Sequence, residues 1–246
     1  MTQTLVRAKG LSKRFLVPWR RGTIFRLLGA FLKREPYRKE FWALQNLYFE
    51  IDKGEKLALI GKNGAGKTTL LRILAGIYQE SSGEIEVTER PAALFRFQTG
   101  LLQDLPVVDN IFLFGAFYGI ERGVISRNVE LILETSKLQH HALSPMKELS
   151  IGQQQQVALS VFFLNPSEFL IFDESLSFID QDFAHRCKDY FENLFSSKKT
   201  VILTSHDNSL LKKYCKTALW LDQGQLHRSG SVEHVMGEYE RPLAGL

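Results

Sequence analysis

Apolar and polar residues alternate along two stretches near the beginning of the chain. Residues 5–15 and residues 44–51 both change between apolar and polar side chains with a period close to two, which is typical of strands with one buried face. Residues 56–60 form a shorter apolar run, and Lys53-Gly54 before it has the composition of a turn. We therefore expect three strands in the first quarter of the chain.

The rest of the chain changes between helical and strand-like patterns. Residues 68–76 have apolar side chains at helical spacing, and residues 101–164 are mostly helical in pattern. Residues 169–172 and 200–204 are continuous apolar runs that suit buried strands, with helical spacing over residues 183–195 between them. Strands separated by helices predict an α/β fold with a mostly parallel sheet and right-handed crossovers. The helical middle, about 100–165, is then an inserted subdomain.

The composition is that of an ordinary globular protein, with no sign of a metal site built from cysteines or of a strongly charged binding surface. With 246 residues, 44% of them hydrophobic, the chain suits one compact globular domain. Its net charge of +4 fits a solvated surface with a few phosphate-binding residues better than a nucleic-acid or anionic-membrane interface. Cys187 and Cys215 lie in no CxxC or Cys/His pattern, which indicates ordinary thiols in a reducing compartment.

No segment has the character of a leader or a membrane span. The opening residues lack the apolar core of a signal peptide. The longest uncharged apolar stretch near the middle, residues 111–120, is half the length needed to cross a bilayer. We expect a soluble, cytoplasmic protein whose membrane role comes through a partner.

A glycine-rich motif joins the third expected strand to the following helix. Residues 61–68 read Gly-Lys-Asn-Gly-Ala-Gly-Lys-Thr. Backbone N–H groups of such a loop bind phosphate oxygens, and the helix presents its positive N-terminus to the same anion. In this motif Lys67 reaches the β- and γ-phosphates, and the Thr68 hydroxyl binds Mg²⁺. The sequence thus predicts ATP and Mg²⁺ as ligands. The nucleotide-binding residues are Gly61, Lys62, Asn63, Gly64, Ala65, Gly66, Lys67, Thr68 and Thr69.

Two adjacent acids, Asp173 and Glu174, follow the apolar run at residues 169–172. Burying an unpaired carboxylate is costly, so acids at the end of a buried strand need a use. With the phosphate-binding loop (P-loop) of residues 61–68 in the same chain, Asp173 is expected to hold Mg²⁺ and Glu174 to polarise the attacking water. A strand that only leaves the core into a polar loop is the alternative, and the P-loop makes it much the weaker one.

A further motif, Leu-Ser-Ile-Gly-Gln at residues 149–153, resembles the LSGGQ signature of the ATP-binding cassette (ABC) family. Ser150, Gly152 and Gln153 match the signature, and Ile151 replaces a glycine. A serine hydroxyl and free N–H groups at a helix start suit a γ-phosphate, although a simple serine N-cap is the alternative. In this family the phosphate belongs to ATP on a second subunit. The resemblance therefore implies a homodimer with shared sites.

Other positions follow the order of the ABC family. The resemblance implies that Asp180 is the D-loop aspartate and that His206, after the strand at residues 200–204, contacts the γ-phosphate. It also implies that Gln98 is the Q-loop glutamine, which binds Mg²⁺ and couples to a membrane partner. The fold implied is a RecA-like core with an N-terminal antiparallel β-subdomain, in one nucleotide-binding domain over residues 1–246.

An aromatic ring is expected against the adenine base. The ABC family places this ring soon after the first strand, where Phe15 stands. Tyr37, Phe41 and Trp42 are alternatives, because a long insertion follows Phe15. Each of the four also has a plain hydrophobic interpretation.

Three stretches resemble the ABC ATPases that export capsular polysaccharide, O-antigen and teichoic acid. They are residues 40–44, after a basic insertion, residues 180–187, and the tail at residues 230–239. The resemblance implies two membrane permease subunits, a peripheral place on the cytoplasmic face of the membrane, and no C-terminal carbohydrate-binding domain. Ile179 and Gln156 depart from the subfamily, which usually has a glycine and a basic residue there.

Residues 20–35 have the pattern of a basic amphipathic helix. Packing on its own domain and contact with a membrane or membrane subunit are equal alternatives for this helix. Because cassettes that import small solutes normally lack such a helix, it favours polymer export over an importer or drug exporter. A soluble ABC ATPase acting on nucleic acid or ribosomes is a third interpretation, disfavoured by the single cassette and the lack of heptads.

Overall fold

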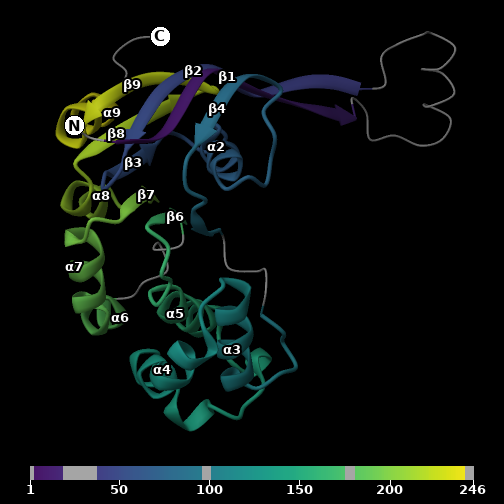
Figure 1. Cartoon of the computed structure of the whole chain (residues 1–246), viewed down its shortest axis with the longest axis vertical. Helices are drawn as coiled ribbons and strands as arrows, with labels where there is room; N and C mark the ends of the chain where they lie inside the picture. Colours follow the sequence, from purple (N-terminus) through teal and green to yellow (C-terminus); the bar gives the residue numbers. More distant parts are fainter. Residues whose placement is uncertain (1–2, 19–37, 96–100, 175–180, 242–246) are drawn as a thin grey trace, which may run out of the picture.

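The computed structural model of the chain describes residues 3–18, 38–95, 101–174 and 181–241. Its upper part in Figure 1 is built mainly from strands, and its lower part is a group of helices that includes α3, α4 and α5. The mostly parallel six-stranded sheet, the antiparallel sheet and the inserted helices confirm the α/β fold class expected from the sequence.

An antiparallel sheet forms the first layer of the upper part. Its strand order is β2-β1-β4, with β1 at Thr4–Pro18, β2 at Arg38–Asp52 and β4 at Ser82–Val87. β1 is irregular, with register shifts against β2, and buries Leu5, Val6, Ala8 and Leu11 in the core that it shares with β2. Beyond the body of the protein, β1 and β2 continue as a two-stranded arm (Figure 1).

The second sheet is mostly parallel and has the order β5-β6-β7-β3-β8-β9. All pairings are parallel except that of β8 with β9. Every residue of β3, β6 and β7 is buried, which explains why the central residues of each strand are all apolar. The strands are β3 (Lys56–Ile60), β5 (Ala92–Leu94), β6 (Phe169–Asp173), β7 (Thr200–Thr204), β8 (Thr217–Asp222) and β9 (Gln225–Ser231).

Helices pack around this sheet and form the lower part. Residues expected to be helical between 101 and 164 contain three α-helices and two short 3₁₀ turns at Gln139–His141 and Met146–Glu148. The helix expected over residues 183–195 is divided at Cys187, although the i to i+4 hydrogen bonds continue on both sides of it. The helices are α2 (Lys67–Leu74), α3 (Val107–Phe117), α4 (Arg122–Thr135), α5 (Ile151–Phe162), α6 (Gln181–Arg186), α7 (Lys188–Ser196), α8 (Asn208–Tyr214) and α9 (Val232–Tyr239).

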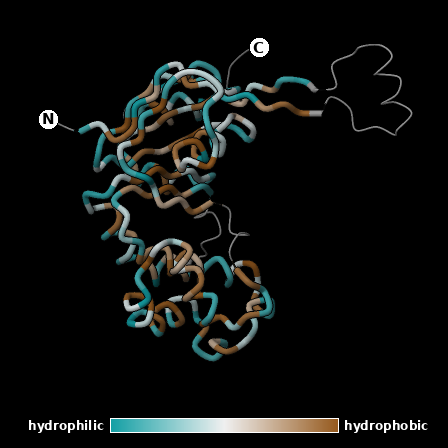
Figure 2. Tube along the Cα trace, turned by 45° about the vertical axis from the view of Figure 1, so that its right-hand side comes forward, coloured by the Kyte–Doolittle hydropathy of each residue, from teal (hydrophilic) through white to brown (hydrophobic). Residues whose placement is uncertain are grey.

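The central strand β3 divides its side chains between two apolar cores. Leu57 and Leu59 pack with α2 and the antiparallel sheet, whereas Ala58 and Ile60 pack with the core that continues into the helical part. Figure 2 shows apolar residues both along the strands of the upper part and on the helices of the lower part. Burial on both faces fixes β3 firmly, and therefore also the loop at its carboxyl end.

Candidate nucleotide-binding site

The glycine-rich loop lies where the motif predicted, between β3 and α2. Gly66 is the N-cap of α2 and has a positive φ of 106°. A Cβ atom there would lie 2.6 Å from the carbonyl oxygen of Ala43 in β2. A side chain at Gly61 would likewise collide with the carbonyl oxygen of Leu221 in β8. The sheet therefore supports a tight loop whose backbone amides can bind an anion.

Lys67 places a cation at the mouth of this loop. Its side chain is nearly buried, and Nζ donates to the carbonyl oxygens of Gly61 at 2.6 Å and Lys62 at 3.2 Å. Burial lowers the pKa of Lys67, while the nearby carboxylates of Glu174 and Asp173 act in the opposite direction. An ammonium group held next to a helix N-terminus is well placed to bind a polyphosphate.

Asp173 comes to the same place at the carboxyl end of β6. The residue is 5% exposed, and its carboxylate accepts two hydroxyl hydrogen bonds, from Thr68 at 2.9 Å and from Thr204 at 3.0 Å. Carboxylate and hydroxyl oxygens are the hard ligands that Mg²⁺ prefers. Thr68 and Asp173, which are 105 positions apart in the chain, thus fit the metal site expected from the sequence.

Glu174 and His206 meet at the ends of neighbouring strands. Oε1 of Glu174 lies 3.2 Å from Nε2 of His206, whose side chain is 60% exposed. Glu174 has a positive φ of 52°, which is uncommon for a residue with a side chain. Its backbone N–H donates to the Thr204 hydroxyl at 2.8 Å. The sequence analysis did not predict a role for Thr204. The only hint in the sequence is that a polar residue ends an otherwise apolar stretch.

The signature residues lie in the other part of the molecule. Ser150 is the N-cap of α5, and Gln153 completes a capping box in which each residue binds the other's backbone N–H. Gly152 is in the first turn of the same helix. Figure 1 shows α5 in the lower part, while α2 and the P-loop belong to the upper part. One copy of the chain therefore does not bring Ser150 to its own P-loop.

The candidates for the adenine ring differ in their surroundings. Phe15 packs edge-on against Tyr78, with ring centroids 5.5 Å apart. Phe41 and Trp42 are more than one third exposed, and both precede Ala43, the residue whose carbonyl contacts the P-loop glycine Gly66. Residues Gln98, Asp180, Tyr37 and the stretch 20–35 lie outside the described residues.

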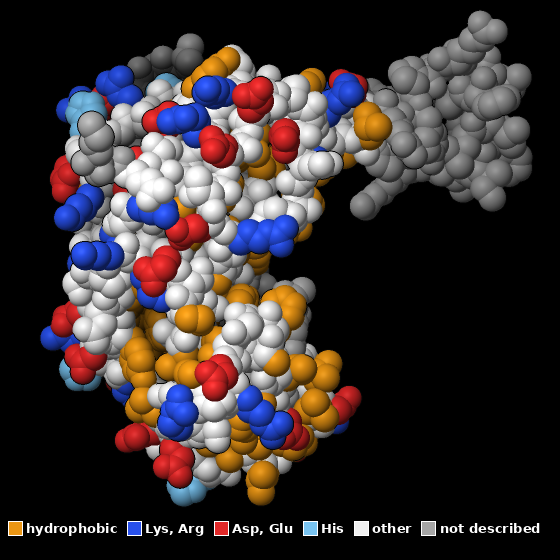
Figure 3. Space-filling view, in the orientation of Figure 1, with side chains coloured by type: hydrophobic (Ala, Val, Ile, Leu, Met, Phe, Trp, Pro, Cys, Tyr) orange, Lys and Arg blue, Asp and Glu red, His pale blue; other side chains and the backbone are white. Residues whose placement is uncertain are grey.

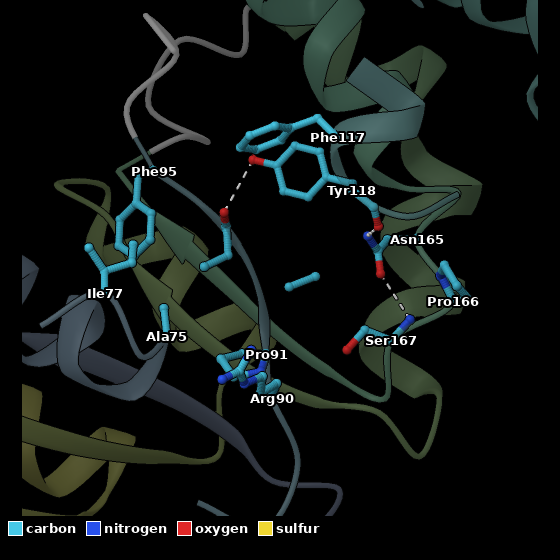
Figure 4. A pocket seen from close by; sticks show the side chains of 12 residues that line it. Ala75, Ile77, Arg90, Pro91, Phe95, Phe117, Tyr118, Asn165, Pro166 and Ser167 are labelled. Atoms are coloured by element: carbon cyan, nitrogen blue, oxygen red, sulfur yellow. Dashed lines mark hydrogen bonds between the residues drawn. The ribbon is translucent and has the colours of Figure 1, made fainter. Parts of the chain in front are cut away.

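An apolar cavity of about 580 Å³ opens between the upper and lower parts. Figure 4 shows Ile77 and Phe95 facing Phe117 and Tyr118 across it. Ile77 is 56% exposed and Phe117 is 66% exposed. Figure 3 shows hydrophobic side chains gathered around the hollow between the two parts.

The sequence pattern of the ABC transporter family matches residues 44–177, which is more than half of the chain and includes the P-loop, Ser150 and both acids. The chain belongs to the ABC transporter family. This cassette is 31% identical over 239 residues to the teichoic acids export ATP-binding protein TagH of Lactococcus lactis. That match covers 96% of the chain and 50% of TagH, so the chain spans about half the length of this relative.

Two further matches agree with this family. The O-antigen export system ATP-binding protein RfbB of Klebsiella pneumoniae is 29% identical over 206 residues, with 84% of each chain covered. The fold is that of a solved dimeric ATP-binding cassette, MJ0796, in a post-hydrolysis state bound to ADP and Pi. The TM-score is 0.71 at 19% identity, over 92% of this chain and 98% of that one. Among the described residues of our chain, we find no helix long and apolar enough to cross a membrane.

Proposed function

We propose that this chain is the ATP-hydrolysing subunit of an ABC transporter that exports a cell-surface polymer of the capsule, O-antigen or teichoic-acid type. The observation that carries the ATPase assignment is the meeting of Thr68 from the P-loop helix with the buried carboxylate of Asp173, beside Lys67 and Glu174. The polymer class rests on the export proteins TagH and RfbB, which the chain resembles over most of its length.

Within this site, the P-loop amides and Lys67 bind the phosphates of ATP, with Thr69 in the following turn. Thr68 and Asp173 hold Mg²⁺, with Gln98 as a further ligand. When bound, the ion neutralises charge on the β- and γ-phosphates. The hard oxygen atoms of Thr68 and Asp173, which lie 2.9 Å apart, support this assignment.

Glu174 positions the water that attacks the γ-phosphorus. Its carboxylate takes a proton from the water as the new O–P bond forms and the bond from the γ-phosphorus to the bridging β-phosphate oxygen breaks. ADP and inorganic phosphate leave, and Glu174 passes the proton on to the phosphate. His206 lies 3.2 Å from Glu174 and contacts the γ-phosphate from the neighbouring strand. The position of both side chains at the carboxyl end of the parallel sheet supports these roles.

Two copies of the chain complete two shared sites. Ser150, Gly152 and Gln153 of one copy bind the γ-phosphate held by the P-loop of the other copy, and Asp180 contributes to the same nucleotide site. The support is that α5 begins in the lower part, remote from the P-loop of its own chain (Figure 1). Closing the dimer on ATP and reopening it after hydrolysis moves the membrane partners by population shift.

The partners are two permease subunits, which hold the dimer at the cytoplasmic face of the membrane. The apolar cavity lined by Ile77, Phe95 and Phe117 is the place where a permease segment binds. Its support is the exposure of large apolar side chains around a hollow, next to the strand that leads toward Gln98. Residues 20–35 supply a second contact with the membrane or with a permease.

The ATPase assignment is tested by Glu174→Gln. This variant keeps the shape of the side chain but loses the carboxylate, so we expect unchanged ATP binding and a loss of hydrolysis of about 100-fold or more. Turnover is measured as phosphate release, and binding by a fluorescent ATP analogue. Glu168→Gln, at the other end of β6, is the matched control and should hydrolyse ATP like wild type. A Glu174→Gln enzyme with near wild-type turnover would refute the catalytic assignment.

The export assignment is tested in the native cell. Replacing the chain by the Glu174→Gln variant should remove the surface polysaccharide or teichoic-acid polymer, which is measured by extraction and electrophoresis. Lipid-linked polymer should accumulate inside the cell. A normal surface polymer together with loss of uptake of a small solute would instead identify an importer.

A further inference from the structure

The last residue of β7, Thr204, is a hydroxyl-bearing side chain with no exposed surface. The three residues before it, Val201 to Leu203, are apolar and equally buried, as expected for a central parallel strand. A hydroxyl is costly to bury unless it is hydrogen-bonded. Thr204 is directly opposite Asp173 in the register of β7 and β6. Its hydroxyl is therefore within reach of Asp173 and of the next residue, Glu174.

The Thr204 hydroxyl uses both of its hydrogen-bonding functions on that pair. Oγ1 donates to Oδ1 of Asp173 at 3.0 Å and accepts from the backbone N–H of Glu174 at 2.8 Å. The carbonyl oxygen of Phe172 is farther away, at 3.5 Å. One side chain therefore connects the carboxylate of the first acid to the backbone of the second.

The backbone of Glu174 needs such a restraint. Its φ of 52° lies in the left-handed region, where a residue with a Cβ atom is strained. Strained residues persist where their surroundings hold them. In this conformation the Glu174 side chain turns toward β7 and reaches His206 at 3.2 Å.

We propose that Thr204 is a positioning residue for ATP hydrolysis. Its hydroxyl holds Glu174 in the left-handed backbone conformation and orients the Asp173 carboxylate toward Thr68. It acts through these two acids and does not itself touch the nucleotide. This inference rests on the proposed ATPase function and adds to it a residue outside the sequence motifs.

If Thr204 served packing alone, Thr204→Val would be tolerated better than Thr204→Ser, which is the reverse of the order that a hydrogen-bonding role predicts. Valine has nearly the shape of threonine but no hydroxyl, so packing alone would tolerate Thr204→Val. Serine keeps the hydroxyl and loses the methyl group, so Thr204→Ser separates the hydrogen bonds from the volume of the side chain. Thr200, at the opposite end of β7, is a matched control because its buried hydroxyl also accepts a backbone N–H, from Gly54 at 2.9 Å.

The experiment compares the full-length wild type with Thr204→Val, Thr204→Ser and Thr200→Val. In steady-state ATPase assays, we expect Thr204→Val to lower kcat at least tenfold with KM for ATP within about twofold of wild type, because small displacements of catalytic groups are expensive. Thr204→Ser should retain at least half of kcat, and Thr200→Val should hydrolyse ATP like wild type. If Thr204→Val does not fold, Thr204→Ala takes its place.

A second measurement needs no nucleotide. Hydrogen exchange of the Glu174 amide, followed by NMR, should become at least tenfold faster in Thr204→Val and stay near wild type in Thr204→Ser and Thr200→Val. Thr204→Val with kcat within twofold of wild type, Thr204→Ser as slow as Thr204→Val, or unchanged exchange at Glu174 would each overturn the proposal. An inactive wild type would refute the ATPase function, and the exchange measurement would still decide the role of the hydroxyl.

Discussion

Two buried lysines, Lys56 at the start of β3 and Lys67 beyond its carboxyl end, show how similar residues acquire different uses. Burial lowers the pKa of both Lys56 and Lys67. Lys56 donates to backbone carbonyl oxygens, including that of Ser197 at 3.0 Å, and the positive charge of Lys216 further lowers the pKa of Lys56. Lys67 is next to two carboxylates and a helix N-terminus. Lys56 therefore ties loops together at one end of the sheet, whereas Lys67 serves the site at the other end.

Both cysteine thiols are held in their protonated form by the core. Burial raises the pKa of Cys187 and of Cys215 from 9.0 to about 12. Between pH 9 and pH 12 the folded protein keeps two protons that the unfolded chain releases. The stabilisation from these thiols is thus fully present below pH 9 and is lost as the pH rises toward 12.

We therefore expect native Cys187 and Cys215 to resist dithionitrobenzoate at pH 8 and to react only in denaturant. The urea midpoint of wild type should also fall between pH 9 and pH 11. The Cys187→Ala/Cys215→Ala variant is less stable at pH 8 but should show a shallower fall over the same range. Equal slopes for the two proteins would contradict the raised thiol pKa values.

At the scale of elements, the sequence pattern located the buried strands better than the exposed ones. The predicted bounds of β3 and β7 agree with the structure, because both strands are buried along their whole length and apolar in their central residues. β4 was not predicted, since most of its residues are exposed and its sequence, Ser-Gly-Glu-Ile-Glu-Val, is largely polar. Tertiary pairing with β1 decides its conformation.

The residues of the candidate site also differ in how well the sequence pattern predicts them. The P-loop and the acidic pair could be recognised because their chemistry lies within consecutive residues. Thr204 could not, because its role depends on its register opposite Asp173. The adenine candidates depend on an irregular register between β1 and β2, which shifts at Lys13 and Arg14 and brings Ala43 to the P-loop.

The capping box of α5 allows a prediction at this scale. Ser150→Ala removes the side-chain acceptor for the Gln153 amide and should destabilise the nucleotide-free chain by about 1 kcal/mol. For a chain of this size, that is a fall of roughly 2–4 °C in Tm. Ser150→Thr keeps an oxygen at the same place and should melt close to wild type. Equal melting of all three proteins would show that the cap does not stabilise α5.

At the scale of the whole molecule, the cavity between the strand-rich and helical parts is the surface that we assign to a membrane partner. Ile77, which follows α2, and Phe117, at the end of α3, lie on opposite sides of the cavity (Figure 4), and both are exposed. A partner segment bound there contacts both parts at once. Under this assignment, the segment responds if the two parts move relative to each other when the proposed dimer closes.

Replacing both residues, in Ile77→Ser/Phe117→Ser, should leave soluble ATPase activity unchanged and strongly reduce copurification of the permease and polymer export. Leu143→Ser is the control, because Leu143 is 80% exposed and does not line the cavity. Normal copurification of the double variant would show that the permease binds elsewhere.

The order of strands also governs when the protein can first acquire its site during synthesis. The P-loop strand β3 lies between β7 and β8, yet β7 begins about 140 residues after β3 ends. At a translation rate of about 5–20 residues per second, β3 waits on the order of ten seconds for its first neighbour in the sheet. Asp173 and Thr204 also reach their places only after this pairing. A nascent chain therefore exposes an apolar strand well before it can bind nucleotide, and chaperone contact should be concentrated in that interval.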